Sequence, residues 1–350
     1  MTTPIKIGDR TIGPDLPPLL IAEMSANHNG SLERALEIVD AMADAGADAL
    51  KLQTYTADTL TLDVDRPEFR VSGDHGLWGS RTLYDLYLEA ATPWAWHEPI
   101  FVRARERGML AFSSAFDPTS IRFLEELDVP AHKVASAELV DLPLVRAMAE
   151  TGKPLIISTG MANLAEMIAA VEAARETGNT DIIVLACTAA YPAPVNETNL
   201  RAIPLMQQVL GCQIGYSDHT EGIGAAVAAV ALGATVIEKH VTLRRADGGV
   251  DAAFSLEPDE VHLLTASMRA GWAALGRPVI GASTAEAEVR RFRRSLYVTR
   301  DVAAGETVTA DNVRSIRPAG GLPADTFTEV AGRTFVRAVR KGTAFTWDLV

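Results

Sequence analysis

The feature that most constrains the fold is a set of eight short apolar or β-branched runs that alternate with longer segments of helical period. The runs are LLIAEMS from Leu19, ALKLQTY from Ala49, LAFSSAF from Leu110, AHKVAS from Ala131, PLIISTG from Pro154, DIIVLACT from Asp181, QIGYSD from Gln213 and TVIEKHV from Thr235. This alternation is typical of repeated βα units with a parallel sheet. Eight units predict an α/β fold in which a (β/α)8 barrel, or TIM barrel, forms most of the chain.

The segment SLERALEIVDAMADAGA shows the helical pattern, because its apolar residues recur at three and four positions. We predict that Ser31 caps this helix, that Glu33 lies near the positive end of its dipole, and that Gly46 ends it. The long stretch from Thr56 to Thr92 breaks the alternation and is rich in aromatic residues. We therefore expect it to be an insertion over the mouth of the barrel.

The composition of the sequence changes after the helical segment that ends at GWAAL, where charged and small residues become frequent. We predict a barrel domain over residues 1–275, a charged linker over 276–293, and a compact domain of short strands and turns over 294–350. A domain this small buries little apolar surface. We therefore expect it to dock on the barrel or on a second subunit.

Composition narrows the function classes. A formal net charge of −13 without a basic stripe argues against nucleic acid as a partner, and acidic substrates must meet a local positive site. The two cysteines, Cys187 and Cys212, cannot build a disulfide framework, and the first residues lack the apolar core of a signal peptide. No apolar run is long enough to cross a bilayer. We expect a cytoplasmic protein with no membrane partner.

Polar residues stand at nearly every predicted strand end, which is where a barrel of this kind places its active site. They are Glu23, Asn27, His28, Lys51, Gln53, Ser113, Ser114, Lys133, Ser136, Glu138, Ser158, Thr159, Thr188, Tyr191, Ser217, Asp218, His219, Glu238, Lys239 and His240. Burying Lys51 or Lys133 without an anionic partner is costly, so we expect a phosphate or carboxylate to bind beside them. The alternatives are lysines that reach solvent along the barrel wall and serines that only cap strand ends.

His219 and His240 end neighbouring predicted strands and can converge on one ion. An open two-histidine site, completed by water and a substrate oxygen, suits manganese or another divalent ion used as a Lewis acid. The alternative is a pair of unrelated polar core histidines. Glu23 would act as acid, as base or as a partner of a metal ligand. Cys187 lacks an obvious activating base in the sequence, so we expect a small buried apolar residue there.

Seven motifs occur in order across nearly the whole chain: IAEMSANHNGSLERALEIVDAMADAGADALKLQTYT, HKVASAELVDLPL, ISTGMA, CTAAYPAP, GYSDHTEG, IEKHVTL and GVDAAFSLEP. Together they resemble the sialic acid synthase family, and the C-terminal segment resembles that family's SAF, or antifreeze-like, β-clip domain. The resemblance implies a metal-dependent condensation of phosphoenolpyruvate with an N-acetylated amino sugar, giving a nine-carbon 2-keto acid and phosphate. It also implies a homodimer in which each SAF domain closes over the partner's barrel.

The resemblance implies roles for individual residues. Those that would hold phosphoenolpyruvate are Lys51, Gln53, Ser114, Lys133, Ser136 and Ser217. His219 and His240 would bind the metal, Mn²⁺ with Mg²⁺ or Co²⁺ as alternatives, and would form the catalytic set with Glu23. The residues that would contact the sugar are Glu138, Tyr191, Asp251 and Arg317, the last from the SAF domain of the other subunit. The alternative for Arg317 is an ordinary surface arginine.

Ala189 stands where N-acetylneuraminate synthases of this family commonly have asparagine, so the substrate pocket is expected to differ. The stretch Leu83–Pro99 and the motif GGVDAAFSLEP resemble the branch that makes pseudaminic acid from 2,4-diacetamido-2,4,6-trideoxy-L-altrose. This sugar is less polar than N-acetylmannosamine. We expect Trp78, Tyr84 and Tyr87 to pack on its methyl groups.

Other functions stay open at this point. Within the family, the alternative function is that of an N-acetylneuraminate or N,N'-diacetyllegionaminate synthase. A non-catalytic sugar-binding or ice-binding protein would not need two strand-end lysines and a histidine pair. A barrel aldolase would instead form a Schiff base with Lys133 or Lys239.

Overall fold

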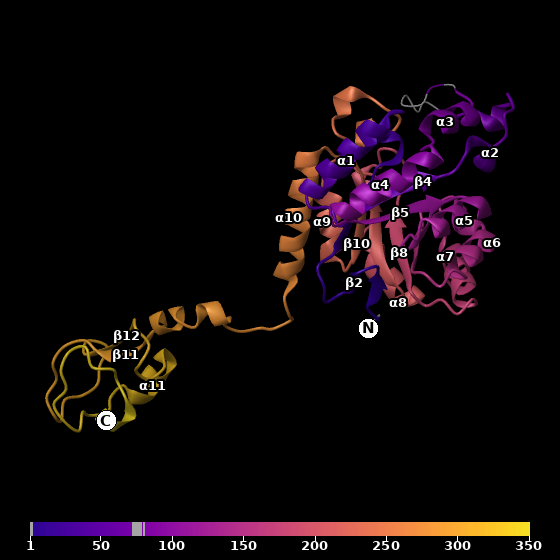
Figure 1. The fold of residues 1–350 in the computed structure, drawn as a ribbon. Coiled ribbons are helices and arrows are strands. Elements are labelled where there is room, and N and C mark those ends of the chain that lie inside the picture. Colours follow the sequence, from indigo (N-terminus) through magenta and orange to yellow (C-terminus); the bar gives the residue numbers. More distant parts are fainter. Residues whose placement is uncertain (1–2, 72–78, 80) are drawn as a thin grey trace. The chain divides into compact units, whose positions relative to one another are not determined.

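The computed structural model describes residues 3–71, 79 and 81–350, and the chain divides into two compact units, Met1–Gly276 and Arg277–Val350 (Figure 1). The first unit contains a closed barrel of eight parallel strands. They are β3 (Leu19–Glu23), β4 (Ala49–Thr54), β5 (Leu110–Ala115), β6 (His132–Val134), β7 (Leu155–Ser158), β8 (Ile182–Cys187), β9 (Gln213–Asp218) and β10 (Val236–His240). Each predicted run contains one of these strands, so the predicted barrel is confirmed.

The barrel closes where its last strand pairs with its first. On β10, Glu238 lies opposite Ile21 and His240 lies opposite Glu23. On the other side of β3, Lys51 of β4 lies opposite the same Glu23. Residues more than two hundred positions apart in the chain are therefore neighbours at one end of the barrel.

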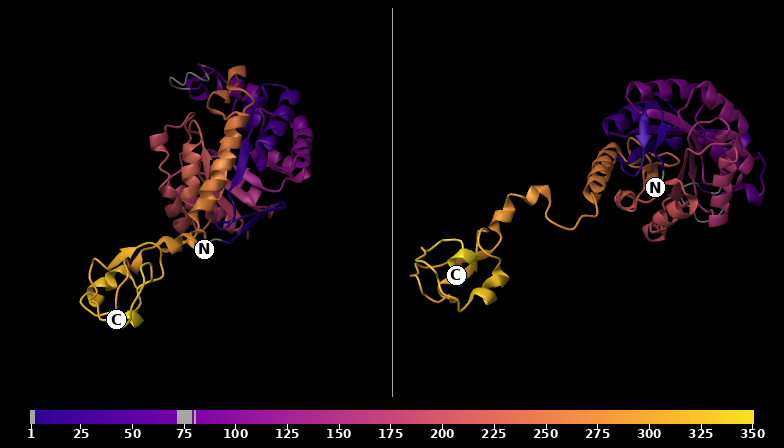
Figure 2. Two further views of the ribbon diagram at one scale, coloured as in Figure 1. Left: turned by 90° about the vertical axis from the view of Figure 1, so that its left-hand side faces the viewer. Right: turned by 90° about the horizontal axis from the view of Figure 1, so that it is seen from below.

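Helices surround the barrel strands (Figure 2). They are α1 (Leu32–Asp44), α4 (Trp94–Glu106), α5 (Pro118–Glu126), α6 (Leu142–Ala149), α7 (Leu164–Arg175), α8 (Ala202–Leu210), α9 (Gly224–Ala231) and α10 (Pro258–Leu275). The longest of them, α10, contacts both α9 and α1. Among the described residues, no helix is both long enough and apolar enough to span a bilayer.

Helix α1 forms as its sequence predicts. The Ser31 hydroxyl accepts a hydrogen bond from the Arg34 N–H at 3.2 Å, and Glu33 lies in the first turn. The apolar positions Ala35, Ile38, Val39 and Met42 are buried against the barrel. Gly46 follows with a φ of +88°, a left-handed conformation that glycine adopts without steric cost.

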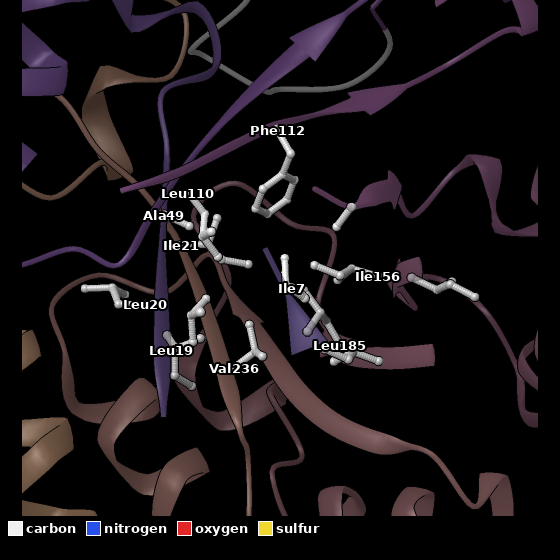
Figure 3. Packing of buried hydrophobic residues seen from close by; sticks show 14 of the residues in the cluster. Ile7, Leu19, Leu20, Ile21, Ala49, Leu110, Phe112, Ile156, Leu185 and Val236 are labelled. Carbon is white, nitrogen blue, oxygen red and sulfur yellow. The ribbon is translucent and has the colours of Figure 1, made fainter. Parts of the chain in front are cut away.

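A hairpin that the sequence pattern did not predict closes the N-terminal end of the barrel. Strands β1 (Ile5–Ile7) and β2 (Arg10–Ile12) pair antiparallel, and Ile7 packs among Leu110, Ile156 and Leu185 (Figure 3). The Gln213 side chain donates to the carbonyls of Thr3 and Ile12 at 2.8 and 2.9 Å. Strands of three residues are too short to show a period, which is why this hairpin was missed.

In its described residues, the insertion between β4 and α4 contains the α-helices α2 (Ala57–Leu60) and α3 (Leu83–Ala90) and the short 3-10 helix Pro67–Phe69. Tyr87 of α3 meets Tyr55, directly after β4, edge to face with ring centres 5.9 Å apart. The insertion therefore contacts the end of the barrel at which the strands finish. Trp78, one of the aromatic residues expected to meet the sugar, lies outside the described residues.

The second unit has a core of its own. Strands β11 (Ser295–Val298) and β12 (Val313–Ile316) pair antiparallel, and a short helix, α11 (Phe327–Val330), follows. Further bridges join Val302 to Val339 and Thr307 to Thr334. The buried residues include Leu296, Val313, Phe335 and Phe345. This unit has the short strands and turns that its sequence predicts, while the predicted linker over 276–293 stays a prediction.

Candidate active site

Strand alternation carries charged side chains into the C-terminal end of the barrel. The apolar core contains Ile21, Ala49, Phe112, Ile156 and Val236 (Figure 3). The residue two positions later on each strand faces the same interior. These residues are Glu23, Lys51, Ser114, Ser158 and Glu238, and one further step adds Gln53 and His240. All except Gln53 are buried.

Lys51 lies at the centre of an ion-pair network. Its ammonium group contacts the Glu23 carboxylate, lies 3.7 Å from Glu238 Oε1, and donates to Ser114 Oγ at 3.1 Å. Burial by itself would lower the pKa of Lys51, but the Glu23 and Glu238 carboxylates raise it. Lys51 is therefore an ammonium ion that two protein carboxyls already balance.

Glu23 and Glu238 are buried on neighbouring strands beside that ammonium. Glu23 Oε1 accepts a hydrogen bond from the Ser25 N–H at 3.1 Å. Burial raises the pKa of Glu23, whereas Lys133 and Lys51 lower the pKa of Glu238 against the effect of burial. Glu23 thus keeps a proton to higher pH than Glu238 does, which suits a group that exchanges protons with a substrate.

Lys133 has a different environment from Lys51. Its Nζ donates to Ser158 Oγ at 2.6 Å and to the Val134 carbonyl at 2.9 Å, and burial lowers its pKa. Within the part of the chain that the structure describes, no carboxylate lies within ion-pair distance of this lysine. Glu238 raises the pKa of Lys133 only from beyond that distance, and a buried cation without a close anionic partner is costly, so this side of the site favours an anionic ligand.

Hydroxyl and amide groups line the space beside the two lysines. Gln53 Nε2 donates to Glu23 Oε1, and Ser217 Oγ donates to Glu238 Oε1, both at 3.2 Å. The resemblance had assigned no role to Ser158 or Glu238, although both face the interior two positions after an apolar core residue. Both are among the strand-end residues singled out from the sequence, and this spacing predicts that they face inward.

Ser136 and Ala189 meet at the next loop. The Gly160 N–H donates to Ser136 Oγ at 3.1 Å, and a Cβ added to Gly160 would lie 2.8 Å from Ala189 Cβ. Ala189 is therefore packed against the site. The difference from N-acetylneuraminate synthases falls beside a residue predicted to hold phosphoenolpyruvate.

The two histidines face each other with ring centres 5.4 Å apart. His219 Nδ1 donates to the Thr188 carbonyl at 2.9 Å, which leaves Nε2 as the nitrogen with a free lone pair. His240 is kept neutral because burial holds its pKa well below the usual value, and among the described residues its buried Nδ1 has no hydrogen-bond partner. Neutral imidazoles are good ligands for divalent metals, so His240 fits the predicted ion. Burial would lower the pKa of His219, but the neighbouring Cys187 raises it overall, so metal binding there would displace a proton.

The structure gives that ion only a few protein ligands. The described residues contain no group of three or more histidine, cysteine or acidic side chains arranged to hold a metal. Two imidazoles leave coordination positions for water and substrate oxygens, which is the arrangement of a catalytic site.

Cys187 differs from its prediction. Its Sγ lies 3.8 Å from His219 Nδ1 and 3.7 Å from Ser136 Oγ. Burial would raise the pKa of the thiol, but His219 lowers it overall. The prediction of a small buried apolar residue missed this neighbour, because the pairing of β8 with β9 brings His219 beside Cys187 from 32 positions away along the chain.

Aromatic and acidic side chains border the histidines where the sugar was predicted to bind. The Tyr191 ring lies 4.3 Å from His219 and 5.3 Å from Phe254, measured between ring centres. Asp251 is buried and accepts a hydrogen bond from Ser25 Oγ. Glu138 is half-buried, and burial raises its pKa. The C-terminal end of the barrel thus brings together the residues of the first unit that were predicted to hold phosphoenolpyruvate, the metal and the sugar.

Two predicted residues lie elsewhere. Lys239 follows Glu238 on β10 and points to the opposite face, where its Nζ lies 2.9 Å from Asp218 Oδ2. This buried ion pair removes Lys239 from the set of Schiff-base candidates. Arg317 is exposed on the second unit, directly after β12, and its predicted contact with a sugar stays a prediction.

Comparison with protein families decides the family. The NeuB family model matches residues 38–279, and the SAF domain model matches residues 293–350. The chain belongs to the NeuB family. The resemblance drawn from the sequence motifs is thereby confirmed.

Several relatives are named pseudaminic acid synthase or N,N'-diacetyllegionaminic acid synthase. A pseudaminic acid synthase of Campylobacter jejuni is 42% identical over 325 residues, which is 93% of this chain and 94% of the relative. A pseudaminic acid synthase of Helicobacter pylori is 37% identical, with 95% of this chain and 97% of the relative covered. Among solved structures, the N-acetylneuraminic acid synthetase of Leptospira borgpetersenii aligns with a TM-score of 0.73 and 31% identity, covering 83% of this chain and 95% of that one.

Proposed function

We propose that this protein is a pseudaminic acid synthase, a transferase that joins phosphoenolpyruvate, 2,4-diacetamido-2,4,6-trideoxy-L-altrose and water into pseudaminic acid and phosphate. The single observation that carries this proposal is the buried Lys133, which has no carboxylate partner among the described residues, beside the paired Lys51. The pseudaminic acid synthase relatives, at 37–42% identity over 93–95% of the chain, support the choice of sugar. The position of Ala189 against the site supports it further.

The lysines and hydroxyls would bind the phosphate and carboxylate of phosphoenolpyruvate. The residues are Lys51, Gln53, Ser114, Lys133, Ser136 and Ser217, together with Ser158 through its hydrogen bond to Lys133. Fixed cations and donors at an anion lower the barrier, because they need no reorganisation as charge moves. Lys133 would gain its missing counter-charge when the ligand binds.

The reaction requires one proton to be held close to the aldehyde. Carbon three of phosphoenolpyruvate forms a bond to the aldehyde carbon, and the Glu23 carboxyl gives its proton to the aldehyde oxygen. Water adds at carbon two and returns one proton to Glu23, and the hydroxyl so formed gives its proton to the phosphate, which leaves as the keto group forms. The raised pKa of Glu23, caused by its burial, supports this role.

His219 and His240 would hold a divalent metal, which we propose is Mn²⁺ with Mg²⁺ or Co²⁺ as alternatives. The chemistry that such a metal supplies is Lewis-acid polarisation of the aldehyde. Tyr191, Glu138 and Asp251 would contact the sugar, and Arg317 would reach it from the partner subunit.

Charge supports a homodimer in which the SAF domain covers a barrel. The unit Met1–Gly276 has 37 acidic and 20 basic residues, a formal charge of −17, whereas Arg277–Val350 has 8 acidic and 12 basic residues, a charge of +4. Opposite charges favour docking and are screened by salt. We expect light scattering to give a dimer mass at low salt. A monomer mass at every protein concentration would contradict the dimer.

Phosphate release by the purified protein with manganese tests the function. The altrose sugar, its legionaminic precursor and N-acetylmannosamine are supplied in parallel, each with and without EDTA. We expect EDTA-sensitive release with the altrose sugar alone. Release with another sugar would make this a legionaminate or N-acetylneuraminate synthase. No release with any sugar would favour a non-catalytic sugar-binding protein, and borohydride trapping of Lys133 would favour an aldolase. The proposed cytoplasmic location is tested by cell fractionation.

A further inference from the structure

Ser25 has a backbone conformation that serine rarely adopts. Its φ is +46°, in the left-handed region that favours glycine, and its side chain is buried at 3% exposure. Holding a non-glycine residue in this region costs free energy, so such a residue persists where its surroundings make use of it. Ser25 begins the short 3-10 helix Ser25–His28 directly after β3, between the barrel strand and α1.

In this conformation Ser25 makes two hydrogen bonds to carboxyl groups. The Ser25 N–H donates to Glu23 Oε1 at 3.1 Å, while the Ser25 hydroxyl donates to Asp251 Oδ2. Glu23 ends β3, and Asp251 lies in the loop that follows β10, so one serine joins carboxyls from opposite ends of the barrel sequence. The Ala26 N–H also bonds to Asp251. A carboxylate held by two donors from one turn has a fixed direction.

We propose that Ser25 is a positioning residue that holds the Asp251 carboxylate toward the sugar while its main-chain N–H orients Glu23. The inference rests on the proposed function, because it takes Asp251 as a sugar contact. It goes further by naming the group that fixes that contact. The left-handed φ allows both bonds at once, since the N–H turns back to a residue two positions earlier and the hydroxyl points across to another loop.

The geometry supplies a clean variant. Ser25→Gly keeps the N–H that bonds Glu23, adopts the positive φ without strain, and removes the CH2OH side chain with its hydroxyl. The matched control is Ser31→Gly, the same change six positions later, where the hydroxyl caps α1 by accepting from the Arg34 N–H. A second pair, Asp251→Asn and the double variant Ser25→Gly with Asp251→Asn, completes a double-mutant cycle.

Steady-state phosphate release gives the two Michaelis constants separately. A hydrogen bond to a charged group is worth a factor of about ten or more, so Ser25→Gly is expected to raise the KM for the sugar about tenfold. The KM for phosphoenolpyruvate is expected to stay within about twofold and the melting temperature to change little, because relief of strain at the positive φ offsets the loss of a buried hydrogen bond. Ser31→Gly changes neither KM. In the Asp251→Asn background, Ser25→Gly is expected to have much less effect.

Three results would overturn the proposal: an unchanged KM for the sugar, an equal rise in both constants, or full additivity in the cycle. The first would show that the hydroxyl does not act on sugar binding, and the second that the change only damages the fold. Failure of the proposed function is distinguishable. A wild-type protein that releases no phosphate with any sugar overturns the proposed function and this inference together, whereas normal wild-type turnover with an unchanged Ser25→Gly variant overturns this inference alone.

Discussion

The two ends of the barrel are built from the same eight strands and have opposite chemistry. At the N-terminal end, apolar side chains fill the interior and the β1–β2 hairpin covers them, with Ile7 among Leu110, Ile156 and Leu185. At the C-terminal end, two residues further along each strand, lysines, carboxyls and histidines face the interior. Apolar side chains fill the first end, while at the second end Lys133 has no carboxylate within ion-pair distance among the described residues. Stability and ligand binding therefore come from different layers of one structure.

Among the variants that test this separation of stability from ligand binding, we expect Lys133→Met to have the largest effect. Loss of the cation is expected to lower kcat/KM about 10³-fold, because a fixed charge at a reacting anion is worth several kcal/mol. The melting temperature should stay constant or rise, because the removed charge was buried without an ion pair. Lys153→Met, at a surface lysine beside Glu125 and Asp128, is the control. A large fall in melting temperature for Lys133→Met would show that this lysine supports the fold.

Ile7→Ala tests the opposite end. Truncating this buried side chain leaves a cavity and should lower the free energy of unfolding by about 3 kcal/mol, with both KM values unchanged. Urea unfolding followed by circular dichroism measures the loss. The exposed Ile280 gives a matched control, since Ile280→Ala removes the same atoms without opening a cavity. Altered KM values for Ile7→Ala would contradict the separation of the two ends.

His97 extends the comparison to a histidine of the scaffold. It is buried in α4, its ring bonds Thr54 Oγ1 at 2.8 Å, and burial lowers its pKa to about 4. The folded protein therefore binds fewer protons than the unfolded chain between about pH 6.5 and 4. Stability is fully present above this window and is lost as the pH falls through it, by about 1 kcal/mol per pH unit.

Thermal melts between pH 7 and 5 measure that loss. His97→Gln should flatten the dependence of the melting temperature on pH, because the titrating group is gone. The exposed His262 on α10 provides the control variant His262→Gln, which should keep the wild-type slope. An unchanged slope in His97→Gln would assign the acid sensitivity to other groups.

The smallest expected effect concerns the insertion. Tyr87 is near Glu138 and meets Tyr55, whereas the Tyr84 hydroxyl bonds Asp58 at 3.2 Å. Tyr87→Leu should raise the KM for the altrose sugar about threefold to tenfold, the size of one aromatic contact. Tyr84→Leu should have less effect. Equal KM values for both variants and the wild type would remove the insertion from sugar recognition.

Much of the fold could be predicted because it follows from patterns within short segments of the sequence. Each barrel strand is buried on both faces, so it reads as a short apolar run, and the run after the α1 helix already contains Lys51 and Gln53. The barrel rule then places strand-end residues in one site without any knowledge of contacts. The β1–β2 hairpin could not be found this way, because its six strand residues show no period and depend on Gln213 for support.

The contacts within the site could not be predicted, because they join separate loops. The approach of Cys187 to His219 needs the β8–β9 register, and the bond from Ser25 to Asp251 needs the closure of β10 on β3. The outward orientation of Lys239, in contrast, could have been predicted from strand alternation. A strand that points Glu238 and His240 inward must point the residue between them outward.

The pairing of β10 with β3 has a consequence for how the molecule is made. Glu23 leaves the ribosome early, yet its neighbour His240 follows more than two hundred residues later. Until that last strand has been synthesised, Glu23, Lys51 and Ser25 exist without Glu238, His240 or Asp251. A chain that ends before β10 therefore contains the lysines and serines proposed to bind phosphoenolpyruvate but lacks one of the two metal-binding histidines and Asp251. Binding of the metal and the sugar during refolding would report barrel closure itself, not the earlier gathering of strands.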